Sequence, residues 1–131
     1  MIVEDNQFIN DSLKKLLEKV VKENGKDFEI MQMTDGVDMI KQIIDDQSNG
    51  NLIKCILTDE NMEYINGSEA IRILRDLEKR NRIKHVKILS ISCQEDGAAV
   101  KMMLDSGADL VLGKPISKNL ISCSLRDLKI F

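Results

Sequence analysis

The strongest constraint on the fold is an alternation of short apolar runs with longer segments of helical period. Runs rich in branched residues, typical of buried strands, occupy residues 2–3, 28–31, 55–58, 86–91 and 110–112. Strands that alternate with amphipathic helices predict a parallel sheet covered by helices on both faces. Right-handed crossovers make such a sheet doubly wound. We therefore predict an α/β fold of five strand–helix units in three layers, with residues 1–131 forming one domain.

Apolar residues spaced three or four positions apart indicate the helix that follows each strand. They are Ile9, Leu13, Leu16, Leu17, Val20 and Val21; Val37, Ile40 and Ile44; Ile71, Leu74 and Leu77; Val100, Met103 and Leu104; and Ile121, Leu125 and Leu128. Gly25 and Gly107 are expected to end helices, and Ser68 and Ser117 to cap helix N-termini. Residues 45–51 form the most polar stretch and are expected to be a loop.

Composition excludes several classes of function. Nineteen Lys and Arg against 22 Asp and Glu leave no basic surface for nucleic acid, and the chain has no Trp. Three widely spaced cysteines predict neither a disulfide framework nor a zinc site. The only histidine, His85, cannot form a multi-histidine metal site and is expected on the surface just before a strand. No apolar run is long enough for a membrane span, so a cytoplasmic domain without direct membrane contact is expected.

Chemically active side chains follow four of the predicted strands. In doubly wound sheets, binding sites lie beyond the carboxyl ends of the strands. Glu4 and Asp5 follow the first strand, Asp59 follows the third, Ser92 ends the fourth and Lys114 follows the fifth. Three crowded carboxylates repel one another, and a divalent cation such as Mg²⁺ relieves that repulsion. A hydroxyl and a lysine beside them suit a phosphoryl group, so the set predicts a phosphoryl site on a carboxylate.

The same residues lie in motifs that resemble the receiver domain of two-component response regulators. Four stretches carry the resemblance in the order and spacing of that family: residues 2–6, residues 57–62 with 65–67, residues 88–92, and residues 106–109 with 113–116. The resemblance covers nearly the whole chain and implies a flavodoxin-like five-stranded parallel sheet. The chain is most similar to the receivers of hybrid sensor histidine kinases, because of residues 6–10 and the Leu-rich first helix.

The resemblance implies a magnesium-dependent phosphoacceptor site. Asp59 is implied as the acceptor, Lys114 as a contact to the phosphoryl group, and Ser92 as a contact after transfer. The implied Mg²⁺ ligands are Glu4, Asp5, Asp59 and the main-chain carbonyl of Asn61. A cis peptide bond between Lys114 and Pro115 is also implied, and Asn61 and Gln94 are expected to tune the lifetime of the phosphorylated state.

Three positions depart from the family pattern. Glu63 stands where a proline is usual, Asn66 where an Asp is usual, and Val111 where an aromatic residue is usual. A loop without proline is expected to be less rigid. Because Val111 has no ring to rotate inward, the conformational switch is expected to be weaker or to follow another route.

The function that follows is a receiver in a phosphorelay. Its expected donor or acceptor is a histidine kinase or a histidine-containing phosphotransfer protein. We expect a domain of a hybrid sensor kinase, tethered to the membrane only through that parent, or a single-domain receiver. It would catalyse its own phosphotransfer and dephosphorylation without being a classical enzyme. Ile9 and Leu13 in the first helix are candidates either for the partner surface or for the core.

The residues leave three alternative functions open. The first is a docking module that is not phosphorylated, which the changes at Glu63 and Val111 favour. The second is a phosphatase of the haloacid dehalogenase type, but that class needs an Asp where this chain has Asn61. The third is a flavin- or nucleotide-binding module, but that class needs a phosphate-binding loop where this chain has Glu4 and Asp5.

Overall fold

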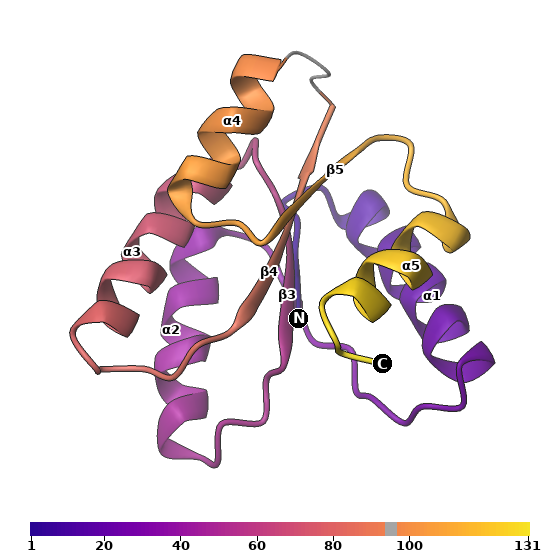
Figure 1. Cartoon of the computed structure of the whole chain (residues 1–131), viewed down its shortest axis with the longest axis horizontal. Coiled ribbons are helices and arrows are strands. Elements are labelled where there is room, and N and C mark those ends of the chain that lie inside the picture. Colours follow the sequence, from indigo (N-terminus) through magenta and orange to yellow (C-terminus); the bar gives the residue numbers. More distant parts are fainter. Residues whose placement is uncertain (94–96) are drawn as a thin grey trace.

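Five parallel strands form a single sheet in the computed structural model, which describes residues 1–93 and 97–131 (Figure 1). The strands are β1 (Ile2–Val3), β2 (Gln32–Met33), β3 (Cys55–Asp59), β4 (Lys87–Ser92) and β5 (Leu110–Gly113). Their order across the sheet is β2-β1-β3-β4-β5, so successive strands are added on one side of β1 and then on the other. This order and the parallel pairing confirm the doubly wound sheet predicted from the sequence.

Helices cover both faces of the sheet and complete the three layers (Figure 1). They are α1 (Gln7–Glu23), α2 (Gly36–Ser48), α3 (Gly67–Lys79), α4 (Gly97–Ser106) and α5 (Lys118–Asp127). Helices α1 and α5 lie on one face, and α2, α3 and α4 lie on the other. The predicted flavodoxin-like α/β architecture is therefore confirmed.

The strands bury side chains on both faces, which explains their continuous apolar runs. Ile56 and Ile88 belong to the core under α2 and α3, whereas Leu57 and Leu89 belong to the core under α1 and α5. Neighbouring residues of one strand thus enter opposite cores, as the two-residue period of a strand requires. The sheet is fixed from both sides, which holds its carboxyl-terminal edge in place.

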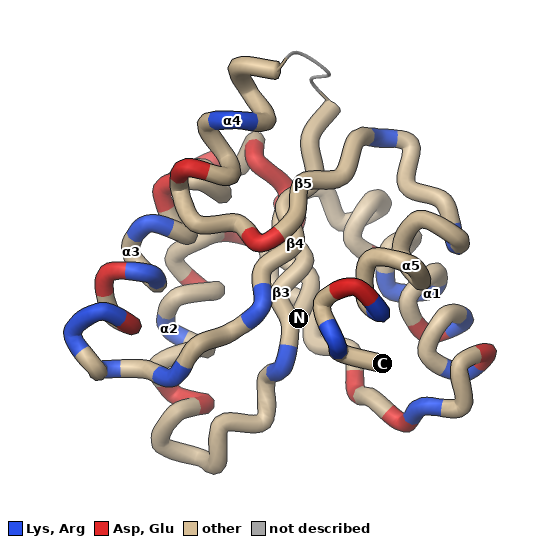
Figure 2. Tube along the Cα trace, viewed as in Figure 1, with Lys and Arg blue, Asp and Glu red and all other residues tan. Residues whose placement is uncertain are grey.

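Charged residues of both signs are spread along the helices on either side of the sheet (Figure 2). Within the described residues, no helix has the length and apolar character that a membrane span requires.

The second strand lies later in the chain than predicted. Residues 28–31 are not in a strand, and β2 begins at Gln32. Its parallel partner β1 contributes only Ile2 and Val3, and Ile2 N–H donates to the Met31 carbonyl at 2.8 Å. The apolar run at residues 28–31 thus lies before the two residues that pair with β1. The apolar pattern alone therefore placed the strand too early in the chain.

The predicted loop at residues 45–51 is partly helical, because α2 continues to Ser48. Asp46 is buried near the end of that helix, and its two carboxylate oxygens accept the N–H groups of Leu52 and Ile53 at 2.9 and 3.0 Å. A residue counted as a polar loop position therefore fixes the turn that leads into β3.

The expected caps are partly confirmed. Ser117 caps α5 by accepting the Leu120 N–H at 3.1 Å, and Gly25 and Gly107 follow helix ends with positive φ angles. Ser68 is not an N-cap: it lies inside α3, which has Asn66 at the N-cap position.

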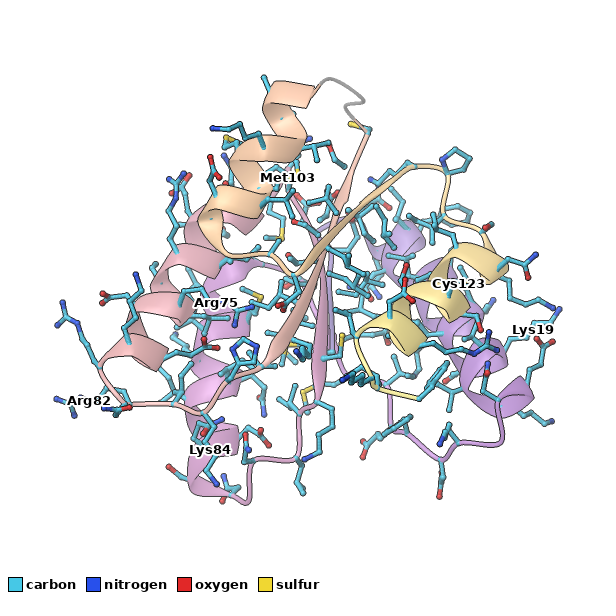
Figure 3. The ribbon with its side chains drawn as sticks, in the orientation of Figure 1. Lys19, Arg75, Arg82, Lys84, Met103 and Cys123 are labelled. Carbon is cyan, nitrogen blue, oxygen red and sulfur yellow. The ribbon has the colours of Figure 1, made fainter. Side chains whose placement is uncertain are left out.

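Arg75 connects α3 to the segment between α4 and β5 (Figure 3). Its guanidinium pairs with Glu78 at 2.6 Å and Asp109 at 3.0 Å, and Nε donates to the Gly107 carbonyl at 2.9 Å. The three charged side chains are at most 24% exposed. His85 lies at the edge of this cluster with a half-exposed side chain, which confirms its expected surface position.

Replacing Arg75 with Ala should lower the free energy of unfolding by about 3 kcal/mol, because two partly buried carboxylates lose their partner. Arg80→Ala is the matched control, because its pair with Asp76 is exposed and should contribute about 0.5 kcal/mol. Urea unfolding measures both. Equal losses for the two variants would contradict a structural role for the Arg75 cluster.

Candidate functional site

The carboxyl ends of four strands bring the predicted residues to one edge of the sheet (Figure 1). Asp59 is the last residue of β3 and Ser92 is the last of β4. Glu4 directly follows β1, and Lys114 directly follows β5. Because parallel strands end at the same edge, residues far apart in the sequence become neighbours.

Asp59 and Lys114 form the central charged contact of this edge. Lys114 Nζ lies 3.2 Å from Asp59 Oδ1, and the Asp59 side chain is only 7% exposed. An ammonium group at this distance stabilises a buried carboxylate and can neutralise charge on a group bound to it. Lys114 is itself held to β4, because its main-chain N–H donates to the Ser92 carbonyl at 2.9 Å. The peptide bond between Lys114 and Pro115 is cis, which confirms the expectation from the sequence.

Glu4 is buried at the end of β1 with an incomplete set of partners. Its Oε1 accepts the Asn6 N–H at 3.1 Å, whereas the buried Oε2 has no hydrogen-bond partner among the described residues. The pKa of Glu4 is raised to about 7, mainly by burial. The negative charge of Asp59 and the neighbouring Asp5 side chain also raise this pKa, whereas the Asn6 N–H and the charge of Lys114 lower it. The Glu4 carboxyl is thus close enough to Asp59 to be affected by its charge, and the joint site of all three acids stays a prediction.

The donors at this edge fit a magnesium ion. Asp5 and Asn61 line a shallow pocket together with Met62, Glu63 and Asn66. Among the described residues, no three or more His, Cys, Asp and Glu side chains converge as a complete ligand set. Mg²⁺ does not need one, since it usually takes one or two carboxylates and keeps several waters. The unpartnered Glu4 oxygen and an all-oxygen donor set suit such an ion.

Ser92 is buried at the end of β4, and Cys93 after it is exposed. Cys93 Sγ lies 4.0 Å from Asn61 Nδ2. Gln94, expected to tune the lifetime of the phosphorylated state, lies outside the described residues. Val111 pairs with Ser90 and is half-buried against the core under α2 and α3.

The sequence analysis missed the role of Asn10. This fully buried residue donates from Nδ2 to the carbonyls of Glu4 and Met33, both at 2.9 Å, and accepts from Gln32. It therefore fixes the ends of β1 and β2 behind the acid pair. A signal existed, because Asn10 is a polar residue on the same face of α1 as Leu13 and Leu17.

The sequence places Gly67 in a motif, and the structure explains why a glycine is needed at this position. A Cβ atom at this position would overlap the carbonyl oxygen of Asp59. The start of α3 can approach the end of β3 this closely only without a side chain.

Glu4→Gln should change the pH dependence of stability in the absence of metal. The folded-state pKa is raised, so Glu4 contributes stability that is full below its ordinary pKa of 4.5 and is lost as the pH rises through about 7. A glutamine avoids that loss. Relative to the unmodified protein, the variant should gain on the order of 2 kcal/mol between pH 4 and pH 8.

Urea unfolding at both pH values measures this difference. Glu69→Gln, which changes an exposed carboxyl on α3, should show no such gain. A constant difference between Glu4→Gln and the unmodified protein across this range would show that Glu4 titrates normally.

Comparison with known proteins identifies the family. The family model described as "Response regulator receiver domain" matches residues 1–126. The chain is 28% identical over 117 residues to hybrid signal transduction histidine kinase A of Dictyostelium discoideum, and 27% identical over 121 residues to kinase I of the same organism. These matches cover 89% and 92% of this chain but only 5% and 7% of those proteins.

Solved receiver structures share the fold. A Francisella receiver domain has a TM-score of 0.73 at 25% identity and covers 97% of this chain and 92% of its own. A putative response regulator receiver from Mycobacterium tuberculosis has a TM-score of 0.74 at 20% identity, with 98% and 94% covered.

A third match comes from a co-crystal of a Saccharomyces cerevisiae histidine phosphotransfer protein with the receiver domain of its response regulator. Its TM-score is 0.75 at 23% identity, with 97% of this chain and 85% of that chain covered. The family-model match over nearly the whole chain and the strand-end acids above lead to one conclusion: this chain belongs to the response regulator receiver domain family of two-component signalling.

Proposed function

We propose that this receiver accepts a phosphoryl group from a partner's phosphohistidine onto the carboxylate of Asp59. The contact between Lys114 Nζ and Asp59 Oδ1 carries the proposal. It places a fixed positive charge beside a buried carboxylate, at the edge of the sheet where the remaining acids gather. The proposal is further supported by the unpartnered oxygen of Glu4, which suits a cation next to the acceptor.

The transfer forms a bond between an Asp59 carboxylate oxygen and phosphorus while the phosphorus–nitrogen bond of the donor breaks. The electron pair of that bond leaves with the imidazole. Lys114 offsets negative charge on the transferring oxygens, so the protein contributes mainly positioning and electrostatics. One or two of the carboxylates of Glu4, Asp5 and Asp59, together with the Asn61 carbonyl and waters, would hold Mg²⁺. When bound, the ion would supply further charge neutralisation at the phosphoryl oxygens.

Ser92 would contact the phosphoryl group after transfer, because it ends the strand next to Asp59. That contact would bias α4 between two arrangements. Val111 packs as a small aliphatic residue against the core, so this switch would not include a rotating ring.

The proposed partner is a histidine kinase or a histidine-containing phosphotransfer protein. The curated relatives are hybrid kinases, and one structural neighbour was solved with a phosphotransfer protein. Of the two candidates for the partner surface, Leu13 is in the core and Ile9 is half-buried. Phe8, on the first turn of α1 and 80% exposed, is the better candidate for the contact.

We infer that this receiver is cytoplasmic and belongs to a hybrid sensor kinase that tethers it to the membrane, or acts as a stand-alone receiver. This chain spans about a twentieth of the length of the curated relatives it matches, so their kinase activity is proposed only for such a parent.

Asp59→Asn should abolish phosphorylation. Incubated with a small phosphodonor and Mg²⁺, the unmodified domain should gain one phosphoryl group that is lost in base. Mass spectrometry measures the gain, and Glu69→Gln, an exposed carboxyl on α3, serves as the control that still gains it. Phosphorylation of Asp59→Asn would overturn the assignment. No gain by the unmodified domain, from small donors or a phosphorylated histidine partner, would favour the docking module.

Lys114→Met should slow phosphorylation by about a hundredfold, because one charged contact to the transferring oxygens is lost. Rates with a small phosphodonor at saturating Mg²⁺ measure the effect. Lys118→Met is a suitable control, because that lysine pairs with Glu23 on α1 instead. An unchanged rate for Lys114→Met would assign Lys114 a purely structural contact.

A further inference from the structure

The loop between Asp59 and α3, residues 60–66, carries most of the pocket at the candidate site. We call it the acceptor loop. At its far end, Asn66 occupies the N-cap position of α3 but makes no side-chain capping hydrogen bond. The first N–H groups of a helix have no partner within the helix, so a buried helix start without a cap is costly. Gly67 and Ser68 are buried at this start.

Glu60, at the near end of the acceptor loop, supplies the missing cap. Its main-chain carbonyl accepts the Gly67 N–H at 2.9 Å. Its carboxylate accepts twice from Ser68, with Oε2 at 2.9 Å from the N–H and Oε1 at 2.6 Å from the hydroxyl. Glu60 and Ser68 are 6% and 4% exposed, so water competes little for these bonds. A carboxylate also interacts favourably with the positive end of the α3 dipole.

The same residue is tied to the neighbouring strand. The Glu60 N–H donates to the Ile91 carbonyl of β4 at 3.2 Å. Glu60 thus joins the end of β3, β4 and the start of α3 through four hydrogen bonds. The acceptor loop is closed at its base by this one residue.

This closure fixes the main chain on both sides of the acceptor. Glu60 directly follows Asp59, and the start of α3 touches the Asp59 carbonyl at Gly67. Asn61, whose carbonyl is a proposed metal ligand, directly follows Glu60. The acceptor loop contains no proline, and Glu63 in its middle is exposed. Its geometry therefore depends on how its two ends are held.

We propose that Glu60 is a positioning residue for the phosphoacceptor site: by capping α3 it holds Asp59 and the Asn61 carbonyl where a metal and a phosphoryl group can use them. Glu60 does not line the pocket, so it acts through its neighbours. The part that concerns phosphorylation rests on the proposed function, and the part that concerns metal affinity can be measured separately.

The test compares Glu60→Ala with Asp46→Ala. Asp46 is a matched control because its buried carboxylate also accepts two hydrogen bonds, from the turn leading into the opposite end of β3. Both variants should lower the free energy of unfolding. At a temperature where both are folded, Glu60→Ala alone should weaken Mg²⁺ binding roughly tenfold, as losses of supporting contacts around metal ligands typically do. Calorimetry and amide NMR spectra of Asp5 and Asn61 measure the affinity.

A second pair of variants separates positioning from simple capping. Asn66→Asp in the Glu60→Ala background should restore a cap and part of the stability, but not the metal affinity. Glu60→Gln should give an intermediate affinity, because it keeps one acceptor oxygen, and it serves if Glu60→Ala does not fold. Full recovery of Mg²⁺ affinity by Asn66→Asp, or unchanged affinity in both Glu60 variants, would overturn the proposal. An unmodified protein that binds Mg²⁺ but is never phosphorylated would overturn the proposed function and leave this inference standing.

Discussion

The candidate site depends on the crowding of carboxylates at the ends of β1 and β3. Glu4 and Asp59 are both buried there, and burial together with their mutual repulsion favours the protonated form of Glu4. Lys114 offsets part of the charge at 3.2 Å from Asp59. Such an arrangement is unfavourable for the free domain and becomes favourable when a cation offsets the negative charge. The proposed metal site would depend on that property.

The surrounding residues keep this unfavourable cluster together. Asn10 holds the ends of β1 and β2, Glu60 holds the end of β3 to α3, and the Lys114 N–H holds the end of β5 to β4. Asn10 and Glu60 are not among the residues proposed to touch the metal or the phosphoryl group. Lys114 is one of them, but it makes this contact through its main chain. Reactive side chains at strand ends can repel one another only because the backbone beneath them is hydrogen-bonded across all the strands.

Much of this could be predicted from the sequence, and the errors have identifiable causes. The alternation of strands and helices predicted the sheet correctly, and the strand-end positions of Asp59 and Lys114 predicted that these two residues would lie close together. The strand at residues 28–31 was wrong because an apolar run does not reveal whether a partner strand lies beside it. Ser68 was wrong as an N-cap because its hydroxyl bonds to Glu60, which is eight residues earlier in the chain.

The sequence by itself determined the fold class and the identity of the chemical groups, because periodicity and residue order are local properties that a parallel sheet converts into position. Only the tertiary structure decided how those groups are supported. It showed that Glu60 bonds to α3 while Asp59, one residue earlier, pairs with Lys114, and that Asn10 and Asp46 are buried partners of the main chain. Hydrogen bonds between distant segments depend on the packing of the whole domain, and no local pattern encodes them.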